Sequence, residues 1–383
     1  MGEYVNPAEI GLYALCWLAA HELQRPWSPS WHKTASEVGA LLRQLRAWQN
    51  PNGEYPQPHG PNTFHNRAFY QWYWLSETPP VVSALEGDHL VPAIDNAWLA
   101  ASLLVIRAHA ESRGQSTLAR AAGALLDTTD FRLWYRPDIH RFLLGEVENP
   151  QGGVFADYYS NENRIVNFVA RALGHLNAEE FYSSLGALER PQGTYGEIAV
   201  ESISWRGAYF TYLAPALFMR EIDTSYGKET IVPATRAQIA YARDQGYRAW
   251  GLSDCYDVED RGYVSQGAPP VSSPEPPETR PGLVTPHASA LALLTPLAPE
   301  AGANLQAIAG AFPDVYHRRY GFRDALVVDP NNPDYGRCSV RFSLLGQIWI
   351  FLALANHQTG FVWRYFYRDP GVARAHREMY GEE

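Results

Sequence analysis

Acidic residues stand beside apolar segments at four places that are far apart in the sequence. Asp95 falls about one turn into the run PAIDNAWLAASLLVI, and Glu162 opens another in YYSNENRIVNF. Asp254 lies in WGLSDCYDVED, and Asp324 lies in YGFRDALVV. Glycoside hydrolysis needs two carboxyl groups, one protonated to assist the leaving oxygen and one ionised as nucleophile or base. These four acids are therefore candidate catalytic groups.

A structural role competes with catalysis for each acid. A carboxylate in the first turn of a helix commonly caps backbone amides and meets the positive end of the helix dipole, and this applies to Asp95 and Glu162. The dipole favours the ionised form, whereas a general acid needs a raised pKa. Asp257, Glu259 and Asp260 are interpreted as a solvated acidic loop, because their spacing does not match a calcium loop.

Aromatic residues are the second chemical feature. The chain has 12 Trp, 23 Tyr and 15 Phe, and many lie in expected loops, as Tyr70 and Trp72 do in FHNRAFYQWYWL. Flat rings with a polar edge suit stacking on the apolar faces of sugar rings. Rings that cap the ends of a helical core would give the same pattern. For Trp205 the alternative is a plug in that core.

Helical segments alternate in character and must position these residues. Six strongly apolar segments begin at Pro7, Pro92, Asn161, Gly207, Pro286 and Ser339. Between them lie amphipathic segments, among them residues 33–48, 115–126, 228–246 and 298–312. Helices that are apolar all round are buried, and amphipathic ones face water. The pattern predicts an all-α (α/α)6 barrel of six inner and six outer helices, with short β-hairpins in the rim loops, over an irregular helical array.

Local signals support the helix starts. Asn6, Pro7 and Glu9 form a possible capping box, and Thr285 places a cap residue before Pro286. Because a toroid closes only with all its helix pairs, we expect a single domain over residues 1–383. The segment from Pro269 to Pro281 is too rich in proline to be helical and reads as an ordered or mobile flap.

Composition limits the partners. The formal charge is −10, with 31 basic and 41 acidic residues and no basic stripe, which argues against nucleic acid. Cys16, Cys255 and Cys338 do not suggest a disulfide framework. No metal, nucleotide or flavin pattern occurs, so no cofactor is expected. No membrane span is expected, and without signal-peptide features we expect a cytoplasmic protein, or a secreted or periplasmic one if the chain was trimmed.

Nine stretches, in order, match a known family. They are FYQWYWL, IDNAWLAASLLVI, SNENRIVNFVARALGH, SWRGAYFTYLAPALF, QIAYARDQGYRAWGLSD, YVSQGAPP, LVTPHASALALL, YGFRDAL and NHQTGFVWRYFYRDP. From Phe69 onward the chain resembles the putative glucoamylase (glucoamylase-like) domain family, which includes β-1,2-glucanases and the transglycosylase domain of cyclic β-1,2-glucan synthases. The resemblance implies a toroid that acts on glucans at its concave mouth.

The resemblance also implies residue roles. The glutamate matching Glu162 is the catalytic acid, the acid matching Asp95 shapes the substrate site, and Asp254 matches a glutamate that is a plausible partner. Three departures bear on activity. Many members have an aspartate where this chain has Gly346, before Gln347, and Thr211 replaces a usual glutamate. Asp254 is one methylene shorter than the expected glutamate.

We therefore predict an enzyme that hydrolyses or transfers β-linked glucosyl units of a β-1,2-glucan-like oligosaccharide or polysaccharide. Glu162 is the general acid/base, Asp254 the second carboxylate, and Asp95 or Asp324 a ligand or alternative partner. The predicted sugar contacts are Arg164, Trp205, Arg206, Tyr209, His287, Gln347, Tyr70 and Trp72. For His287 a helix-capping role is the alternative.

Three other functions compete with this prediction. They are a catalytically impaired glycan-binding toroid, a glycosidase for an α-linked glucan, and a terpene-cyclase-like toroid. The last is prompted by AWQNPNGEYPQ near Trp48 and disfavoured because no DxDD or DDxxD motif accompanies it.

Overall fold

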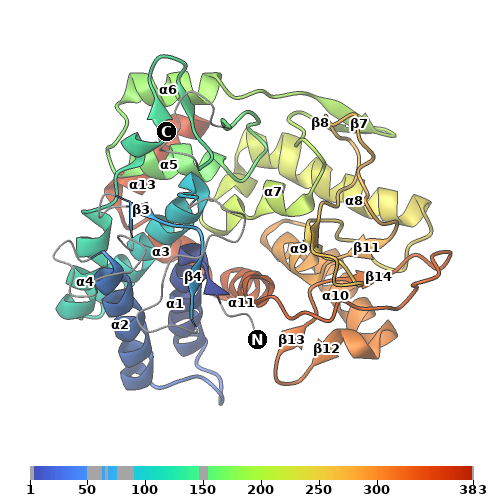
Figure 1. The fold of residues 1–383 in the computed structure, drawn as a ribbon, viewed down its shortest axis with the longest axis horizontal. Coiled ribbons are helices and arrows are strands. Elements are labelled where there is room, and N and C mark those ends of the chain that lie inside the picture. Colours follow the sequence, from blue (N-terminus) through green and yellow to red (C-terminus); the bar gives the residue numbers. More distant parts are fainter. Residues whose placement is uncertain (1–3, 50–62, 65–67, 76–89, 146–153, 382–383) are drawn as a thin grey trace. The chain divides into compact units, whose positions relative to one another are not determined.

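The computed structural model describes residues 4–49, 63–64, 68–75, 90–145 and 154–381, and these residues are mostly helical (Figure 1). The chain forms two compact units. Unit 1 comprises Met1–Asp157, Asn163–Leu188 and Phe361–Glu383, and unit 2 comprises Tyr158–Glu162 and Glu189–Gly360. Whether they act as the predicted single domain stays a prediction. Most of the AWQNPNGEYPQ stretch lies outside the described residues.

Unit 1 is organised around one buried helix. Its helices are α1 (Pro7–Glu22), α2 (Trp31–Trp48), α3 (Ala93–Ser112), α4 (Ser116–Leu126), α5 (Arg164–Ala172), α6 (Ala178–Gly186), α12 (Phe361–Phe366) and α13 (Pro370–Tyr380). Helix α3 is buried over almost its whole length and packs against α1, α4, α5 and α12. At Gly11 of α1, a Cβ atom would lie only 3.0 Å from Leu99 and Ser102, so the two helices approach closely there.

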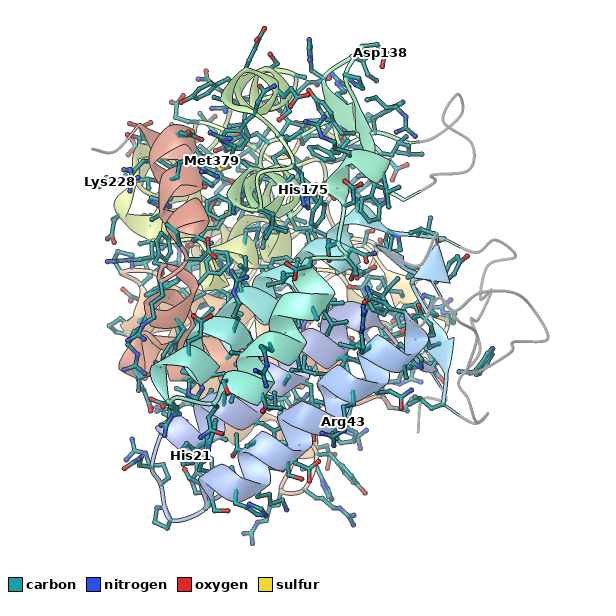
Figure 2. All side chains as sticks on the ribbon, turned by 90° about the vertical axis from the view of Figure 1, so that its left-hand side faces the viewer. His21, Arg43, Asp138, His175, Lys228 and Met379 are labelled. Carbon is teal, nitrogen blue, oxygen red and sulfur yellow. The ribbon has the colours of Figure 1, made fainter. Side chains whose placement is uncertain are left out.

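The predicted start of α1 is confirmed. Asn6 caps the helix by accepting from the Ala8 amide at 2.7 Å, and the Glu9 carboxylate accepts from the Asn6 amide at 3.1 Å. Helix α2 is amphipathic, as predicted: Val38 and Leu42 face the core, whereas Arg43 is exposed. Figure 2 shows the side chains on this part of unit 1, with Arg43 on α2 labelled.

Unit 2 contains both long and very short helices. They are α7 (Tyr209–Leu213), α8 (Val232–Asp244), α9 (Pro286–Leu291), α10 (Ala298–Ala311) and α11 (Leu344–Thr359). The apolar segments predicted from Gly207 and Pro286 are thus only brief α-helices, continued by the 3-10 turns Pro215–Leu217 and Ala292–Leu294. Pro215 lacks an amide hydrogen and so breaks the α-helical ladder after α7.

Short two-stranded ribbons occupy the loops, as predicted. In unit 1, β1 (Tyr4–Val5) pairs with β4 (Tyr73–Trp74), β2 (Thr63–Phe64) with β3 (Ala68–Phe69), and β5 (Tyr135–Arg136) with β6 (Arg141–Phe142). In unit 2, β7 (Gly193–Tyr195) pairs with β8 (Ile198–Val200), β9 (Cys255–Tyr256) with β10 (Tyr263–Val264), β11 (Leu283–Val284) with β14 (Leu326–Val327), and β12 (Tyr316–His317) with β13 (Gly321–Phe322). All the pairs are antiparallel.

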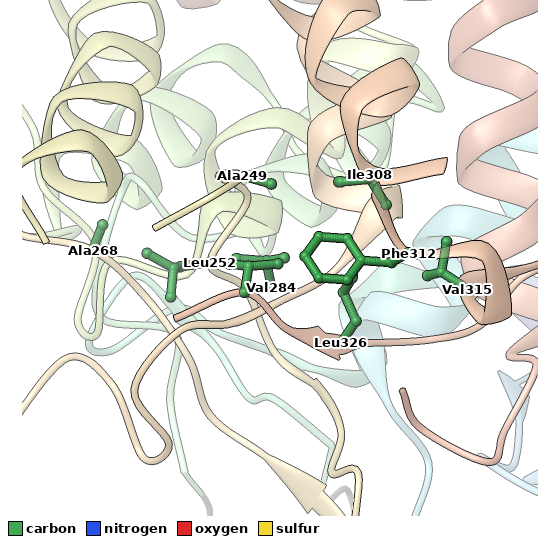
Figure 3. Packing of buried hydrophobic residues seen from close by; sticks show 9 residues of the cluster. Ala249, Leu252, Ala268, Val284, Ile308, Phe312, Val315 and Leu326 are labelled. Atoms are coloured by element: carbon green, nitrogen blue, oxygen red, sulfur yellow. The ribbon is translucent and has the colours of Figure 1, made fainter. Parts of the chain in front are cut away.

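An apolar cluster in unit 2 underlies the loops that carry Asp254 and Asp324. Leu252, Val284 and Leu326 are fully buried there against Ile308 and Phe312 (Figure 3). Leu252 is two residues before Asp254, and Leu326 is two residues after Asp324. The burial of these leucines therefore fixes the backbone on which both acids stand.

The proline-rich segment is ordered and non-helical. The Glu278 carboxylate accepts from the Tyr241 and Tyr247 hydroxyls at 2.7 and 2.9 Å, and from the Gly282 amide at 2.7 Å. Arg280 forms ion pairs with three acids: Asp257, Glu259 and Asp334.

The interpretation of Asp257 as a solvated residue is wrong. Its side chain is only 5% exposed and pairs with Arg280 at 2.9 Å. Glu259 is likewise engaged by Arg280 at 2.9 Å, although Asp260 is exposed and pairs with Arg341. The arginine lies in the proline-rich segment, more than twenty residues away in sequence, so the acidic spacing alone gave no sign of it.

Candidate active site

Buried polar side chains fix the segment that leads to Asp254. Gln238 of α8 donates to the Leu252 carbonyl at 3.0 Å and accepts from the Leu252 amide at 2.9 Å. Asn304 of α10 does the same for Trp250, at 2.9 and 3.1 Å. Gly251 has a φ of +120°, and a Cβ there would lie 2.5 Å from Ser289 Oγ, so this turn requires glycine. The segment is therefore held rigidly.

Asp254 is a partly buried carboxylate near the positively charged side chain of Arg206. Its Oδ1 accepts from the Gln266 amide at 3.0 Å. Desolvation by burial raises its pKa to about 6, against the opposing effects of the Gln266 hydrogen bond, the Arg206 charge and a hydrogen bond from Ser265. A carboxyl group with this pKa can exchange a proton near neutral pH.

Asp324 is more deeply buried and lies close to the same hairpin. It is 5% exposed, and its Oδ2 accepts from the Tyr256 amide at 2.7 Å. Burial raises its pKa to about 6, opposed by the Tyr256 hydrogen bond and the Arg341 charge. Among the residues that the structure describes, neither Asp254 nor Asp324 forms an ion pair. The β9–β10 hairpin thus binds both carboxylates through backbone amides near its two ends.

A small space opens at Gly346, where the family resemblance leads one to expect an aspartate. A Cβ atom there would lie 3.4 Å from Asp324 Oδ1 and 3.7 Å from His287 Nδ1, both ordinary contact distances. The methyl group of an alanine side chain would therefore fit at this position, between a carboxylate and an imidazole. Burial lowers the pKa of His287 to about 4, and its Nδ1 bonds Thr285 Oγ1 at 2.6 Å.

Glu162 lies in a turn rather than in a helix. Helix α5 begins at Arg164 with Asn163 as its N-cap residue, so the prediction that Glu162 stands in the first helical turn is wrong. The segment Tyr158–Glu162 belongs to unit 2, where Ser160 Oγ donates to the Ser202 carbonyl at 2.6 Å. Glu162 therefore immediately precedes the N-cap residue of α5.

Tyr263 lies within electrostatic range of three of the candidate catalytic acids, Glu162, Asp254 and Asp324. Desolvation raises the pKa of its hydroxyl well above the ordinary value, and the negative charges of Asp254, Asp324 and Glu162 raise it further. Glu162, Asp254 and Asp324 thus share one neighbourhood, although their sequence positions are far apart. Sequence reasoning missed Tyr263, for which YVSQGAPP gave only a family match.

The predicted sugar contacts in unit 2 differ in exposure. Trp205 is 45% exposed and packs against Tyr158, with ring centroids 5.7 Å apart. Arg206 pairs with Glu275 at 2.7 Å, and its positive charge lowers the pKa of Asp254. Its buried Nε has no hydrogen-bond partner among the described residues. Contact with a sugar stays a prediction for both residues.

Other predicted contacts lie in the packed interior. Tyr209 is fully buried and its hydroxyl donates to Thr235 Oγ1 at 2.6 Å. Gln347 uses both ends of its amide on the Phe322 backbone, at 2.7 and 3.0 Å. Arg164, in unit 1, is fully buried. These placements favour structural roles, and contact with a sugar stays a prediction for all three.

Asp95, Tyr70 and Trp72 belong to unit 1. Asp95 stands in the first turn of α3 and receives a side-chain hydrogen bond from Asn6. Burial raises its pKa to about 7, so desolvation outweighs the helix dipole that was expected to keep it ionised. Tyr70 is 7% exposed, and Trp72 packs on Tyr4 with ring centroids 5.1 Å apart.

A second acid accompanies Asp95. Burial raises the pKa of Glu9 to about 7, opposed by its hydrogen bond from the Asn6 amide and assisted by the charge of Asp95.

Within the described ranges, no three His, Cys, Asp or Glu residues are placed to hold a metal ion, and no helix is long and apolar enough to cross a membrane.

The family described as Glycoamylase, putative glucoamylase, matches residues 155–370, more than half of the chain. The chain belongs to this family. The resemblance carried by the nine stretches is thereby confirmed, and membership supports a glycosidase-type enzyme as the coarse class. No protein with curated annotation matches the chain in sequence.

Several solved structures share the fold. An endo-β-1,2-glucanase from Chitinophaga pinensis, in complex with sophorotriose and glucose, is 16% identical with a TM-score of 0.78, covering 98% of this chain and 88% of that one. A putative glucoamylase from Bacteroides fragilis is 19% identical with a TM-score of 0.78, covering 99% and 87%. An endo-β-1,2-glucanase mutant from Talaromyces funiculosus, bound to β-1,2-glucan, is 13% identical with a TM-score of 0.72, covering 98% and 80%. The predicted all-α helical-barrel fold is confirmed.

Proposed function

We propose that this protein is a glycoside hydrolase or transglycosylase that acts on a β-linked glucan. The observation that carries the proposal is the pair of carboxylates bound by one hairpin: Asp254 by the Gln266 amide and Asp324 by the Tyr256 amide. Burial raises both pKa values to about 6, so either group can exchange a proton near neutral pH. Glycoside cleavage needs one carboxyl group as acid and another as nucleophile or base, and we assign the first role to Glu162 and the second to Asp254.

Glu162 supplies the third carboxyl group. It lies in a turn outside α5, and its charge acts on Tyr263 together with those of Asp254 and Asp324. In our mechanism Glu162 gives its proton to the leaving oxygen, and Asp254 acts as nucleophile or base on the far side of the sugar ring. Asp324 binds a hydroxyl group of the sugar or a water.

The β linkage is supported by the similar structures that bind sophorose-type ligands. The Chitinophaga pinensis protein holds sophorotriose, and the Talaromyces funiculosus protein holds β-1,2-glucan. We infer that the substrate of this chain is a β-1,2-glucan or a closely related β-glucan. An exposed Trp205 beside Arg206 suits an oligosaccharide, which offers apolar ring faces and hydroxyl groups together.

The test compares glucans of different linkage. Linear β-1,2-, β-1,3- and β-1,4-glucans and an α-glucan are incubated with the protein, and the product lengths and the first anomer released are measured. We expect turnover of a β-glucan, abolished in Glu162→Gln and reduced at least about 100-fold in Asp254→Asn. Glu300→Gln is the matched control, because Glu300 is an exposed acid in the first turn of α10. Full turnover by Glu162→Gln would remove Glu162 from the mechanism.

One observation favours a second candidate, a glycan-binding toroid without catalysis. Gly346 has no side chain where the family resemblance leads one to expect an aspartate, and the Thr211 hydroxyl donates to the Ala208 carbonyl at 2.7 Å in place of an acid. Binding of a β-glucan by the wild-type protein without any change in its chain length would establish this candidate and exclude the enzyme.

A further inference from the structure

Tyr263 is an exposed aromatic residue with a rigid backing. It is 63% exposed, and it stands opposite Tyr256 in the β9–β10 register. The two rings meet edge to face with centroids 5.3 Å apart at an interplanar angle of 77°. The Arg341 guanidinium lies 4.5 Å from the centroid of the Tyr256 ring, and Arg341 is in turn fixed to Asp260 at 2.6 Å. The Tyr263 ring therefore rests on a fixed support while remaining accessible.

The same hairpin places Tyr263 beside the carboxylates. Asp254 immediately precedes β9, and the Gln266 amide that binds it comes two residues after β10. The Tyr256 amide, directly across the ribbon from Tyr263, binds Asp324 at 2.7 Å. Because the hairpin is only two residues long on each side, the backbone of Tyr263 lies close to the amides that bind both carboxylates.

We propose that the Tyr263 ring is the platform on which a glucosyl residue stacks next to Asp254 and Asp324. A glucose ring presents axial C–H groups on its faces, which pack on a flat aromatic surface, and a ring with two side-chain torsions loses little entropy on binding. The inference rests on the proposed function and deepens it, since it identifies what orients the sugar beside the acids.

An exposed tyrosine without a ligand is expected to lie on an ordinary stretch of surface, away from clustered carboxylates. Tyr182 on α6 is exposed to a similar extent, 52%, and its ring packs against Phe181 with centroids 6.0 Å apart. Tyr263 instead shares its surroundings with three acids, and its ring stays exposed although one edge contact joins it to Tyr256. Tyr182 is therefore the matched control.

The experiment measures binding of a β-1,2-linked glucopentaose by calorimetry in a Glu162→Gln background, which prevents turnover. We expect Tyr263→Ala to weaken binding about 10-fold, and Tyr263→Phe to change it by less than about 2-fold, because the ring face and not the hydroxyl makes the contact. Tyr182→Ala should leave the affinity unchanged. Tyr263→Leu, which keeps apolar volume but lacks a flat face, serves if the alanine variant fails to fold.

The outcomes separate this inference from the proposed function. If the wild-type enzyme converts the glucan while Tyr263→Ala and Tyr263→Leu bind as tightly as Tyr182→Ala, the platform is refuted and the enzyme stands. Loss of affinity in Tyr263→Phe equal to that in Tyr263→Ala would also refute stacking, because the hydroxyl would then make the contact. If the wild-type protein neither binds nor converts any glucan, the proposed function fails and the platform fails with it.

Discussion

Replacing Gly346 by alanine tests whether the space beside Asp324 is used. Gly346 lies in the first turn of α11, where its amide donates to Ser343 Oγ at 3.1 Å. The new methyl would lie 3.4 Å from Asp324 Oδ1, 3.5 Å from Ser343 Cβ and 3.7 Å from His287 Nδ1. These are ordinary contacts and the backbone is not left-handed, so the methyl fits without strain.

The change should act in opposite directions on stability and on activity. Alanine in place of a helical glycine stabilises a fold by about 0.4–1 kcal/mol, mainly by restricting the unfolded chain. The methyl would also stand against Asp324 Oδ1, the carboxylate that we propose binds a water or a sugar hydroxyl, and would hinder that contact. Loss of a hydrogen bond to a charged group costs about 1.5–3 kcal/mol, so kcat/KM should fall roughly 10- to 100-fold.

Two measurements decide the matter: the free energy of unfolding from urea titration, and kcat/KM on the best β-glucan. Gly302→Ala in α10 is the control, because a Cβ there would meet no atom within 4 Å. Both variants should be at least as stable as the wild type, and only Gly346→Ala should lose activity. Wild-type activity in a stable Gly346→Ala variant would show that nothing binds between Asp324 and His287.

Three further predictions follow from unit 2. The pKa of Asp324 is raised from 3.8 to about 6, so its stabilising contribution is fully present below about pH 4 and is lost as the pH rises through 6. The change in the free energy of unfolding caused by Asp324→Asn should therefore be more favourable at pH 8 than at pH 4, by up to ~3 kcal/mol. The same change at both pH values would contradict this. Glu278→Ala should lower the free energy of unfolding by about 2–4 kcal/mol, because the Tyr241 and Tyr247 hydroxyls lose their acceptor; Tyr241→Phe, which removes one bond, should cost less. Gln347→Ala should cost about 1–2 kcal/mol with a comparatively small change in KM, whereas a large rise in KM at unchanged stability would place the amide on the sugar.

Local patterns in the sequence determined the helical framework. The apolar run of α3 and the alternating faces of α2 predicted one buried and one surface helix, since burial follows the period of 3.6 residues. The capping box of Asn6 and Glu9 predicted the start of α1 because its partners are three residues apart. The acids themselves were evident from their positions beside apolar segments.

Tertiary structure decided which acids can do chemistry. The amides that bind Asp254 and Asp324 lie 12 and 68 residues away along the chain, and no local pattern encodes such pairs. Desolvation raises both pKa values, and it exists only after the surrounding segments have packed. The same holds for Asp257. The acidic sequence around it suggested a solvated side chain, whereas in the fold it is buried in an ion pair with the distant Arg280. A sequence determines where charges occur along the chain, whereas the fold determines the solvent and the neighbours that set their protonation.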